Sequence, residues 1–255
     1  MALKKQKKKV VFLGGKSIGY YCLHELLRQA DELAIEVIAV ISNSVTQLSA
    51  ENTVENLAKQ HGISVLQHED ELLGMKKFDI LLSVQYHRIL KKEHLKRAKQ
   101  TAVNLHMAPL PEYRGCNQFS FAIADEAKIF GTTLHLMKPG VDDGDILFEK
   151  RFKIPADIFV KELYEMTEKA SKQLFKKSLP MLISGDYTPT PQASLIAKRG
   201  TKFIKRKDIE QLKCIDLQWS QEKIDRHIRA TYFPPFEPPY VLIKGEKYLL
   251  QPKKK

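Results

Sequence analysis

VVFLGGKSIGYY, residues 10–21, places a run of apolar residues directly in front of the tetrapeptide GGKS. A phosphate-binding loop of the Gly-x-x-x-x-Gly-Lys-Ser/Thr type would need its first glycine at position 10, which is occupied by Val10. The glycines that follow also lack the Gly-x-Gly-x-x-Gly spacing of a dinucleotide-binding turn. The stretch therefore predicts a strand, a tight glycine turn and a helix, which together open an α/β sheet.

The alternation of strand and helix patterns continues as far as residue 106. Apolar runs typical of buried strands and segments with helical spacing follow each other in the order strand 9–13, helix 18–30, strand 35–42, helix 54–61, strand 63–67, strand 78–86, helix 91–100 and strand 101–106. This order predicts a Rossmann-like, doubly wound and mostly parallel sheet. Such sheets bind ligands at the carboxyl ends of their strands, so residues that directly follow a strand are the first candidates for a site.

Beyond residue 106 the pattern becomes mixed. The sequence predicts a helix at 119–126, strands at 131–137 and 146–154, a long amphipathic helix at 157–183, a helix at 220–230 and a β-hairpin at 240–251. Lys244-Gly245-Glu246 is expected to form the turn of that hairpin. We therefore expect a catalytic domain at residues 1–190 and a small, β-rich C-terminal subdomain at residues 191–255.

Composition narrows the class of protein. The chain has 255 residues, of which 43% are hydrophobic and 28% charged, as in a globular protein with one large core. It has neither an apolar run of roughly 20 residues nor a secretory signal, so no membrane association is expected. Its three cysteines are scattered, which favours a reducing, cytoplasmic location.

The net charge of +12 leaves two classes of partner open, nucleic acids and small anionic substrates. The lysines are spread along predicted helices and gathered at the two termini, without interleaved aromatic residues that could stack bases. We therefore expect no nucleic-acid partner.

Three polar residues form the candidate catalytic set. Asn104 and His106 end a predicted strand at positions i and i+2, so their side chains should project from the same face. Asp142 lies in the glycine-flanked loop 140–144. An amide, an imidazole and a carboxylate can together support acyl transfer to a nucleophile that belongs to the substrate. Each motif alone is more often structural than catalytic.

Metal sites are not expected. A calcium loop of the EF-hand type would need a closing Glu that the acidic loop after Gly140 lacks. Zinc is disfavoured because His106 and His135 have no partners at ligand spacing in the sequence.

Four motifs in order carry a family resemblance: Asn104-x-His106, PLPEYRG at 109–115, GTTLH at 131–135 and GVDDGDI at 140–146. Over at least residues 8–185 the chain resembles the formyltransferases that use N10-formyltetrahydrofolate. The resemblance implies that Asn104 and His106 stabilise the oxyanion formed when an amine attacks the formyl carbon. It implies that Asp142 holds His106 and helps to take up the proton of the amine.

The same resemblance implies a cofactor site. The pterin ring of N10-formyltetrahydrofolate would lie against the main chain of two loops. The first loop consists of Gln85, Tyr86, His87, Arg88, Ile89 and Leu90, and the second contributes Lys138, Gly140 and Val141.

The length of the chain bears on the acceptor. The family members that formylate initiator tRNA carry a C-terminal barrel domain of roughly one hundred residues, for which this chain has too little room. Glycinamide ribonucleotide enzymes would end near residue 200. The intermediate length, the RGCNQ loop at 114–118 and the tail at 224–240 resemble the sugar N-formyltransferases, which act on nucleotide-linked amino sugars.

This likeness implies dTDP-4-amino-4,6-dideoxyglucose as the acceptor, on a route to O-antigen or another lipopolysaccharide component. A dTDP-linked 3-amino-3,6-dideoxy sugar and methionyl-tRNA are the alternatives. The expected substrate-binding residues are Gly15, Lys16, Ser17, Met107, Arg114, Gly115, Asn117, Gln118, Arg229, Tyr232 and Phe233. The aromatic residues of the tail fit a core or dimer contact equally well, and the terminal hairpin predicts a homodimer.

Overall fold

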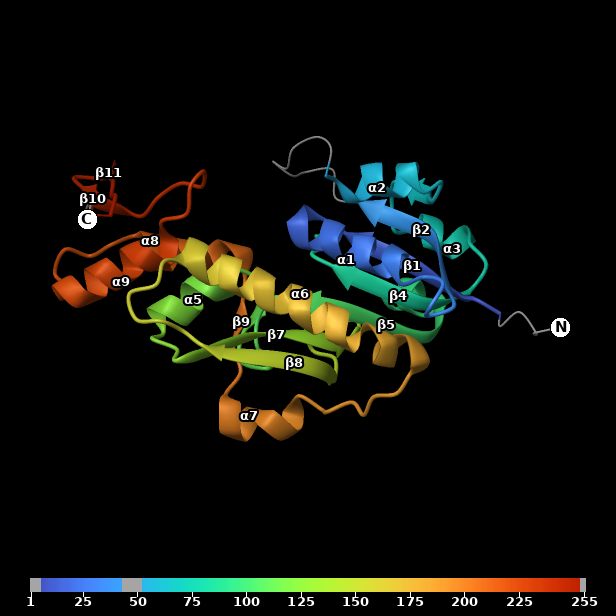
Figure 1. The fold of residues 1–255 in the computed structure, drawn as a ribbon. Helices are drawn as coiled ribbons and strands as arrows, with labels where there is room; N and C mark the ends of the chain where they lie inside the picture. Colours follow the sequence, from blue (N-terminus) through green and yellow to red (C-terminus); the bar gives the residue numbers. More distant parts are fainter. Residues whose placement is uncertain (1–5, 43–51, 253–255) are drawn as a thin grey trace. The chain divides into compact units, whose positions relative to one another are not determined.

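The computed structural model describes residues 6–42 and 52–252 (Figure 1). The outermost parts of the lysine-rich ends, residues 1–5 and 253–255, lie outside the described residues. Within the described residues, seven strands form one sheet in the order β3-β2-β1-β4-β5-β7-β8. The strands are β1 (Lys8–Gly14), β2 (Ile35–Ser42), β3 (Ser64–Leu66), β4 (Phe78–Val84), β5 (Ala98–His106), β7 (Ile129–Leu136) and β8 (Ile146–Lys153).

Strands β1 to β5 pair in parallel, whereas β5 and β7 pair antiparallel. This arrangement confirms the predicted doubly wound and mostly parallel sheet. The opening stretch folds as expected, because β1 ends at Gly14 and helix α1 (Lys16–Arg28) begins two residues later. The main-chain N–H of Gly15 donates to the carbonyl of Val84 at 3.1 Å, which ties the glycine turn to the end of β4.

The remaining elements are helices and small strands outside the large sheet. The helices are α2 (Val54–Gln60), α3 (Glu71–Gly74), α4 (Lys92–Leu95), α5 (Gln118–Ala124), α6 (Val160–Ser184), α7 (Ala193–Arg199), the 3-10 helix η1 (Arg206–Ile209), α8 (Glu210–Lys213) and α9 (Gln221–Thr231). The small strands are β6 (Arg114–Gly115), β9 (Phe203–Ile204), β10 (Tyr240–Ile243) and β11 (Glu246–Leu249).

The predicted helix at 91–100 is wrong over its second half. Only one turn, α4, is helical, and the chain enters β5 at Ala98. The residues from Ala98 onward pair with β4, where Thr101 lies opposite Ile80. Hydrogen bonding to a buried neighbouring strand thus outweighs the helix propensity of the lysine-rich segment.

The described chain packs into two compact units that interleave along the sequence. The first unit consists of Met1–His106, Thr133–Glu149 and Ser171–Ser194, and the second of Met107–Thr132, Lys150–Ala170 and Leu195–Lys255. The expected division into a catalytic domain at 1–190 and a C-terminal subdomain at 191–255 concerns which residues carry the activity. These compact units do not test it, so it stays a prediction.

In the first unit, helix α1 lies against β1 and against α2 (Figure 1). One core cluster joins strands β1, β2 and β4 through side chains such as Val11, Ile41 and Leu81. Leu90, from the loop that follows β4, is 3% exposed and belongs to the same cluster. Strands that are apolar at almost every position are typical of a parallel sheet buried on both faces. The core therefore anchors one end of the loop at 85–90.

In the second unit, α5 packs against α9, and aromatic rings surround the fully buried Phe130. The rings of Tyr113 and Phe119 each lie 5.7 Å from the ring of Phe130. The predicted hairpin is present as β10 and β11. Its turn is shorter than expected, because Glu246 already pairs with Ile243.

Lys244 and Gly245 therefore form a two-residue turn, with φ of 51° and 86°. Positive φ at both central residues is typical of a type I′ turn, whose twist matches that of the two strands.

Candidate active site

Strand pairing at the end of β5 brings the predicted catalytic side chains toward a third polar residue. In the antiparallel pair of β5 and β7, Asn104 lies opposite His135 and His106 lies opposite Thr133. Residues directly opposite each other in such a pair carry side chains on the same face of the sheet. Asn104 and His106 share a face because they are two residues apart, so His135 joins them there.

The carboxylate of Asp142 lies between two imidazoles. Its Oδ2 is 3.6 Å from Nδ1 of His106, and its Oδ1 is 3.4 Å from Nε2 of His135. The His106, His135 and Asp142 side chains are only 6%, 3% and 12% exposed. Solvent therefore screens electrostatic interactions in this cluster less than it does at the protein surface.

His135 fixes the orientation of the Asn104 amide. Its Nδ1 lies 2.8 Å from the carbonyl oxygen of Leu136, which can only accept, so Nδ1 carries the proton. Nε2 of the neutral ring is then an acceptor, and the Asn104 amide nitrogen donates to it at 3.1 Å. From the sequence, His135 was considered as a metal ligand and as the end of the GTTLH motif, and this role was not predicted. The register of the strand pair was the signal that could have found it.

The loop that carries Asp142 requires its glycines. Asp142 has φ of 50°, in the left-handed region that side chains rarely adopt. A Cβ atom at Gly144 would collide with the carbonyl oxygen of Leu136, and a Cβ atom at Gly140 would collide with the carboxylate of Asp143. The glycine pattern of this loop is thus explained by its close approach to β7 and by its own tight folding.

The loop at 85–90, predicted to hold a cofactor, begins with a reversal of the chain. Gln85 follows β4 with φ of 56°, and its Oε1 accepts a hydrogen bond from Nζ of Lys16 at 3.0 Å. Ile89 is 65% exposed, whereas its neighbour Leu90 is buried in the core. The loop is therefore held at both ends and presents an apolar side chain to solvent between them.

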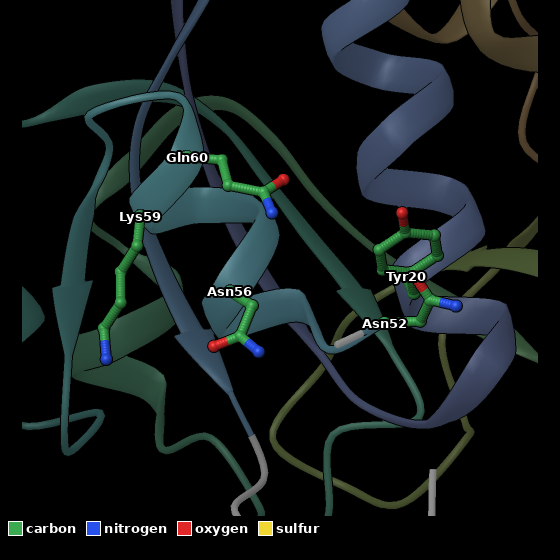
Figure 2. A pocket seen from close by; sticks show the side chains of 5 residues that line it. All are labelled: Tyr20, Asn52, Asn56, Lys59 and Gln60. Atoms are coloured by element: carbon green, nitrogen blue, oxygen red, sulfur yellow. The ribbon is translucent and has the colours of Figure 1, made fainter. Parts of the chain in front are cut away.

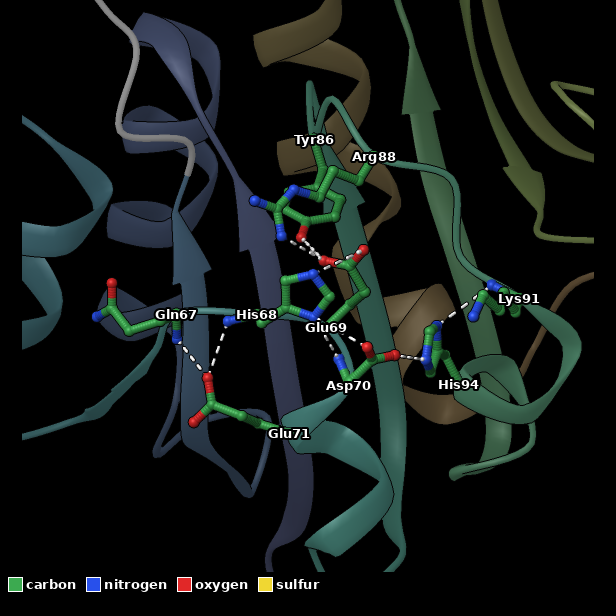
Figure 3. Close-up of polar contacts among 9 residues, drawn as sticks. All are labelled: Gln67, His68, Glu69, Asp70, Glu71, Tyr86, Arg88, Lys91 and His94. Carbon is green, nitrogen blue, oxygen red and sulfur yellow. Dashed lines mark hydrogen bonds and ion pairs between the residues drawn. The ribbon is translucent and has the colours of Figure 1, made fainter.

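Glu69 braces this loop from the neighbouring turn (Figure 3). Its Oε2 accepts hydrogen bonds from the Tyr86 hydroxyl at 2.7 Å and from Nη1 of Arg88 at 3.1 Å. Burial on its own raises the pKa of the Glu69 carboxyl. The bonds donated by Tyr86, the main chain and Arg88 together outweigh burial and lower that pKa to about 2. Sequence analysis did not identify Glu69.

The next residues of the same turn hold the far end of the loop (Figure 3). The fully buried His94 accepts a hydrogen bond from the main chain of Lys91 through Nδ1 at 3.2 Å. Its Nε2 therefore carries the proton in the neutral ring and donates to Oδ1 of Asp70 at 2.9 Å. Glu69 thus contacts the first part of the loop after β4, and Asp70 contacts His94 of α4, which in turn bonds the end of that loop at Lys91.

Replacing Glu69 with Gln should reduce the free energy of unfolding by about 2 kcal/mol near neutral pH, since two bonds to a charged acceptor are weakened. The pKa of Glu69 lies below its ordinary value of 4.5 in the folded protein, so its contribution is complete above about pH 4.5. That contribution is lost as the pH falls toward about 2. Urea denaturation over this pH range should therefore show the gap between wild type and Glu69→Gln closing.

The matched control for this experiment is Glu71→Gln. Glu71 belongs to the same turn and accepts from the main-chain N–H groups of Gln67 and His68 at 2.7 and 2.8 Å, a role that an amide oxygen can keep. This variant should follow the pH dependence of the wild type. A gap between wild type and Glu69→Gln that stayed constant down to about pH 2 would contradict the assignment.

The predicted substrate residues divide between the two units. Gly15, Lys16 and Ser17 belong to the first unit, and the others belong to the second. There, Arg114 lies 5.9 Å from the centre of the Phe203 ring across the β6–β9 pair. Asn117 donates through Nδ2 to the carbonyls of two residues, Lys205 at 3.3 Å and Arg206 at 2.9 Å.

Several of these side chains contribute to packing. Met107 is fully buried and Gln118 is 8% exposed. Phe233 packs on the core cluster of the second unit, with its ring 5.9 Å from that of Tyr164. Nη2 of Arg229 lies 3.6 Å from a carboxylate oxygen of Asp157. Binding of a substrate by the residues of the second unit, Gly115 and Tyr232 included, stays a prediction.

A separate pocket of about 580 Å³ opens beside α1 and α2 (Figure 2). It is lined by Tyr20, Asn52, Asn56, Lys59 and Gln60, none of which was a predicted site residue. Lys59 is already paired with Glu55 at 2.7 Å.

Within residues 6–42 and 52–252, no group of three or more His, Cys, Asp or Glu side chains is placed to hold a metal ion. Among the same residues, no helix is both long and apolar enough to cross a membrane. Cys22, Cys116 and Cys214 form no disulfide among the residues that the structure describes.

A family model described as formyl transferase matches residues 7–179, more than half of the chain. The chain belongs to the formyl transferase family. This member of the family is 31% identical over 185 residues to the bifunctional polymyxin resistance protein ArnA of Wigglesworthia glossinidia brevipalpis. That match covers 69% of this chain and 28% of ArnA.

Two further relatives are named for different formyl acceptors. The chain is 30% identical over 172 residues to the GDP-perosamine N-formyltransferase of Brucella melitensis, with 67% of this chain and 63% of that protein covered. It is 28% identical over 251 residues to the methionyl-tRNA formyltransferase of Lactobacillus gasseri, with 94% and 76% covered. The chain thus spans less than two thirds of the ArnA and GDP-perosamine relatives.

Solved structures share the fold. The N-formyltransferase of Helicobacter canadensis, in complex with folinic acid and dTDP-3-aminofucose, superposes with a TM-score of 0.77 at 24% identity. The match covers 94% of this chain and 86% of that one. This similarity confirms the formyltransferase fold expected from the order of the motifs.

Proposed function

We propose that this protein transfers a formyl group from N10-formyltetrahydrofolate to the amino group of a nucleotide-linked amino sugar. The observation that carries the proposal is the cluster of Asn104, His106 and Asp142, completed by His135, at the end of β5 in one compact unit. An amide, imidazoles and a carboxylate in a buried site suit the attack of an amine on a formyl carbon.

Each side chain has a role in this proposal. When bound, N10-formyltetrahydrofolate would supply the formyl group, and tetrahydrofolate, with a proton on N10, would be the leaving group. Asn104 and His106 stabilise the negative charge that develops on the formyl oxygen. Asp142 orients His106 and takes up the proton that the attacking amine releases. His135 keeps the amide of Asn104 turned with its nitrogen toward the ring, which pre-organises the remaining N–H for the formyl oxygen.

The residues present suit a folate. The loop at 85–90, which Glu69 and Lys16 brace, and the loop that contains Lys138, Gly140 and Val141 both belong to the first unit. In the described part of the chain, Oδ1 of Asp143 is buried without a hydrogen-bond partner. A buried, unpartnered carboxylate oxygen suits a ligand that brings N–H donors, as a pterin ring does.

For the acceptor we propose dTDP-4-amino-4,6-dideoxyglucose. Two relatives support a sugar nucleotide: the Helicobacter structure contains dTDP-3-aminofucose, and the Brucella protein is named for GDP-perosamine. In the second unit, Arg114 and Arg229 supply positive charge for a diphosphate, and Tyr232 supplies a ring for a base. The proposed setting is the cytoplasm, on a route to O-antigen or lipopolysaccharide.

A panel of acceptors tests the proposal. The protein is mixed with N10-formyltetrahydrofolate and, separately, with dTDP-linked 4-amino and 3-amino dideoxy sugars and GDP-perosamine, and the products are weighed by mass spectrometry. Gain of one formyl group by the dTDP-linked 4-amino sugar, at the highest kcat/KM of the panel, is the expected result. Faster formylation of another panel member would overturn the choice of sugar. Transfer to none of them would overturn the sugar class.

A second acceptor, methionyl-tRNA, has support of its own. The match to the Lactobacillus gasseri enzyme extends over 94% of this chain, and the chain carries a net charge of +12. Binding that neutralises phosphates weakens steeply with salt, so tRNA affinity measured over a series of salt concentrations separates this alternative from sugar formylation. Formylation of methionyl-tRNA together with a steep salt dependence would favour it.

The terminal hairpin supports the proposal of a homodimer. Leu242, Tyr248 and Leu249 are 53%, 49% and 57% exposed, and Phe236, just before the hairpin, is 64% exposed. Leu242 and Leu249 lie on the same face of the hairpin, because Leu249 pairs with Tyr240, two residues before Leu242, whereas Tyr248 lies on the other face. Exposed apolar side chains on one face mark interaction surfaces, and a two-fold dimer would bury them.

We expect light scattering to give about twice the chain mass of 29.3 kDa for the wild type. A Leu242→Glu, Leu249→Glu double variant should fall to the mass of one chain, because it places charges in the interface. The Lys244→Glu variant, which changes the turn, serves as the control for added charge. A wild-type mass of 29.3 kDa would contradict the dimer.

A further inference from the structure

Gln192 lies in the segment between α6 and α7, beside the loop of Asp142. Two residues earlier, Thr190 pairs with Ile146 at the start of β8 through hydrogen bonds of 2.8 and 2.9 Å. This pairing anchors the segment to the sheet. The Gln192 side chain is 6% exposed, and its amide nitrogen donates to the carbonyl oxygens of Asp142 at 2.9 Å and Gly144 at 2.7 Å.

These two bonds occupy both hydrogens of the amide nitrogen. The bonded carbonyls lie on either side of residue 143, so the amide spans the turn of the loop. Asp142 holds a left-handed φ of 50°, which a side chain disfavours. Relaxation of its backbone toward an ordinary conformation would turn the carbonyls away from Gln192 and leave a buried donor unpaired, which is costly.

We infer that Gln192 is a positioning residue, which acts through the main chain of Asp142 to keep its carboxylate between His106 and His135. The inference rests on the proposed formyl transfer. Gln192 touches none of the reacting groups in this account. Its effect comes from the backbone conformation that it stabilises, because a carboxylate that leaves this place can no longer orient His106 or receive the proton of the amine.

The variant that tests the inference is Gln192→Met, which keeps an unbranched side chain of similar length and removes both donors. Gln100 provides a control for the exchange of a glutamine by methionine, since it is exposed and its amide donates to one main-chain carbonyl of the same unit, that of Ile183, at 3.2 Å. Gln100→Met therefore loses the same kind of bond at a distance from the loop in sequence. Both variants are compared by kcat, by KM for each substrate and by thermal unfolding.

For Gln192→Met we expect kcat to fall about ten- to a hundredfold, because the catalytic geometry is lost. KM for the amino sugar should be nearly unchanged, whereas KM for the folate should rise, because Gly140 and Val141 of the loosened loop belong to the predicted cofactor site. Gln100→Met should keep kcat and change the unfolding temperature little, because Gln100 is exposed. Gln192→Glu keeps the shape of the side chain without its donors and should lower kcat at least as far. Equal loss of kcat in Gln100→Met and Gln192→Met would overturn the inference.

Hydrogen exchange gives a readout that does not depend on activity. Amides in residues 140–145 should exchange faster in Gln192→Met than in the wild type, and exchange there should be unchanged in Gln100→Met. Unchanged exchange in Gln192→Met would overturn the inference even for an active enzyme. If the wild type transferred no formyl group, the proposed function would be overturned. Faster exchange of the loop amides in Gln192→Met would in that case still support the role of Gln192 in positioning Asp142.

Discussion

Replacement of His106 with alanine is expected to lower kcat for formyl transfer by about a thousandfold. The His106 side chain is 6% exposed, and its Nδ1 faces the Asp142 carboxylate at 3.6 Å. Its removal takes away a stabiliser of the developing oxyanion and separates the carboxylate from the reacting amine. KM should change much less, because neither predicted cofactor loop contains His106.

The control for this variant is His227→Ala. His227 is also buried, and its Nδ1 bonds the carbonyl of Leu212 at 3.1 Å, but it belongs to the second unit. Loss of a buried imidazole there should lower the unfolding temperature and keep kcat near that of the wild type. If His106→Ala retained wild-type kcat, or lost no more than His227→Ala, the catalytic role of His106 would be rejected.

The second large effect is expected for Asp142→Asn. We expect kcat to fall by about a thousand- to ten-thousandfold, as it does when an amide replaces the carboxylate of a catalytic triad. The exchange preserves size but removes the negative charge from between His106 and His135. The new amide nitrogen would also present a donor to one of the rings, which favours the wrong tautomer.

Asp145→Asn is the matched control for Asp142→Asn. Asp145 lies in the same loop, and its carboxylate pairs with Lys138 at 2.9 Å on the protein surface. Surface ion pairs contribute little to stability, so this variant should keep a kcat close to that of the wild type. Steady-state kinetics and thermal unfolding of both variants make the comparison. Similar losses of kcat would show that the loop is sensitive as a whole and that Asp142 has no special role.

The sheet could be predicted because the sequence pattern of each strand is local. Each of the long strands β1, β2 and β4 contains an apolar run, at residues 10–13, 37–41 and 80–82, and the segments between them carry helical spacing or glycine turns. That Asn104 and His106 have their side chains on the same face followed from the two-residue period of a strand. The error at 91–100 has the same origin, since a helix-forming composition says nothing about the neighbouring strand that recruits Ala98.

The supporting residues could not be predicted, because their partners are distant in the sequence. Glu69 bonds residues 17 and 19 positions away, and Gln192 bonds carbonyls 50 and 48 positions away. Neither residue stands in a motif whose residue types point to such a role. His135 was closer to prediction, because the antiparallel register of two predicted strands places it opposite Asn104.

Burial also limits what sequence can say about substrate residues. Met107 was expected among the substrate-binding residues, but its side chain is fully buried. Phe233 was expected either to bind a base or to pack in the core, and its ring contacts those of Tyr164 and Phe236. Aromatic composition alone does not separate these roles, because the same ring serves either one.

The most direct test of the central claim follows one carbon atom. The wild type and His106→Ala are each mixed with N10-formyltetrahydrofolate labelled with ¹³C in the formyl group and with the dTDP-linked amino sugar, and the sugar is examined by NMR after a single turnover. The account predicts an N-formyl ¹³C signal on the sugar with the wild type and its near absence with His106→Ala. A label that stayed on the folate with the wild type, or that reached the sugar equally fast with His106→Ala, would contradict it.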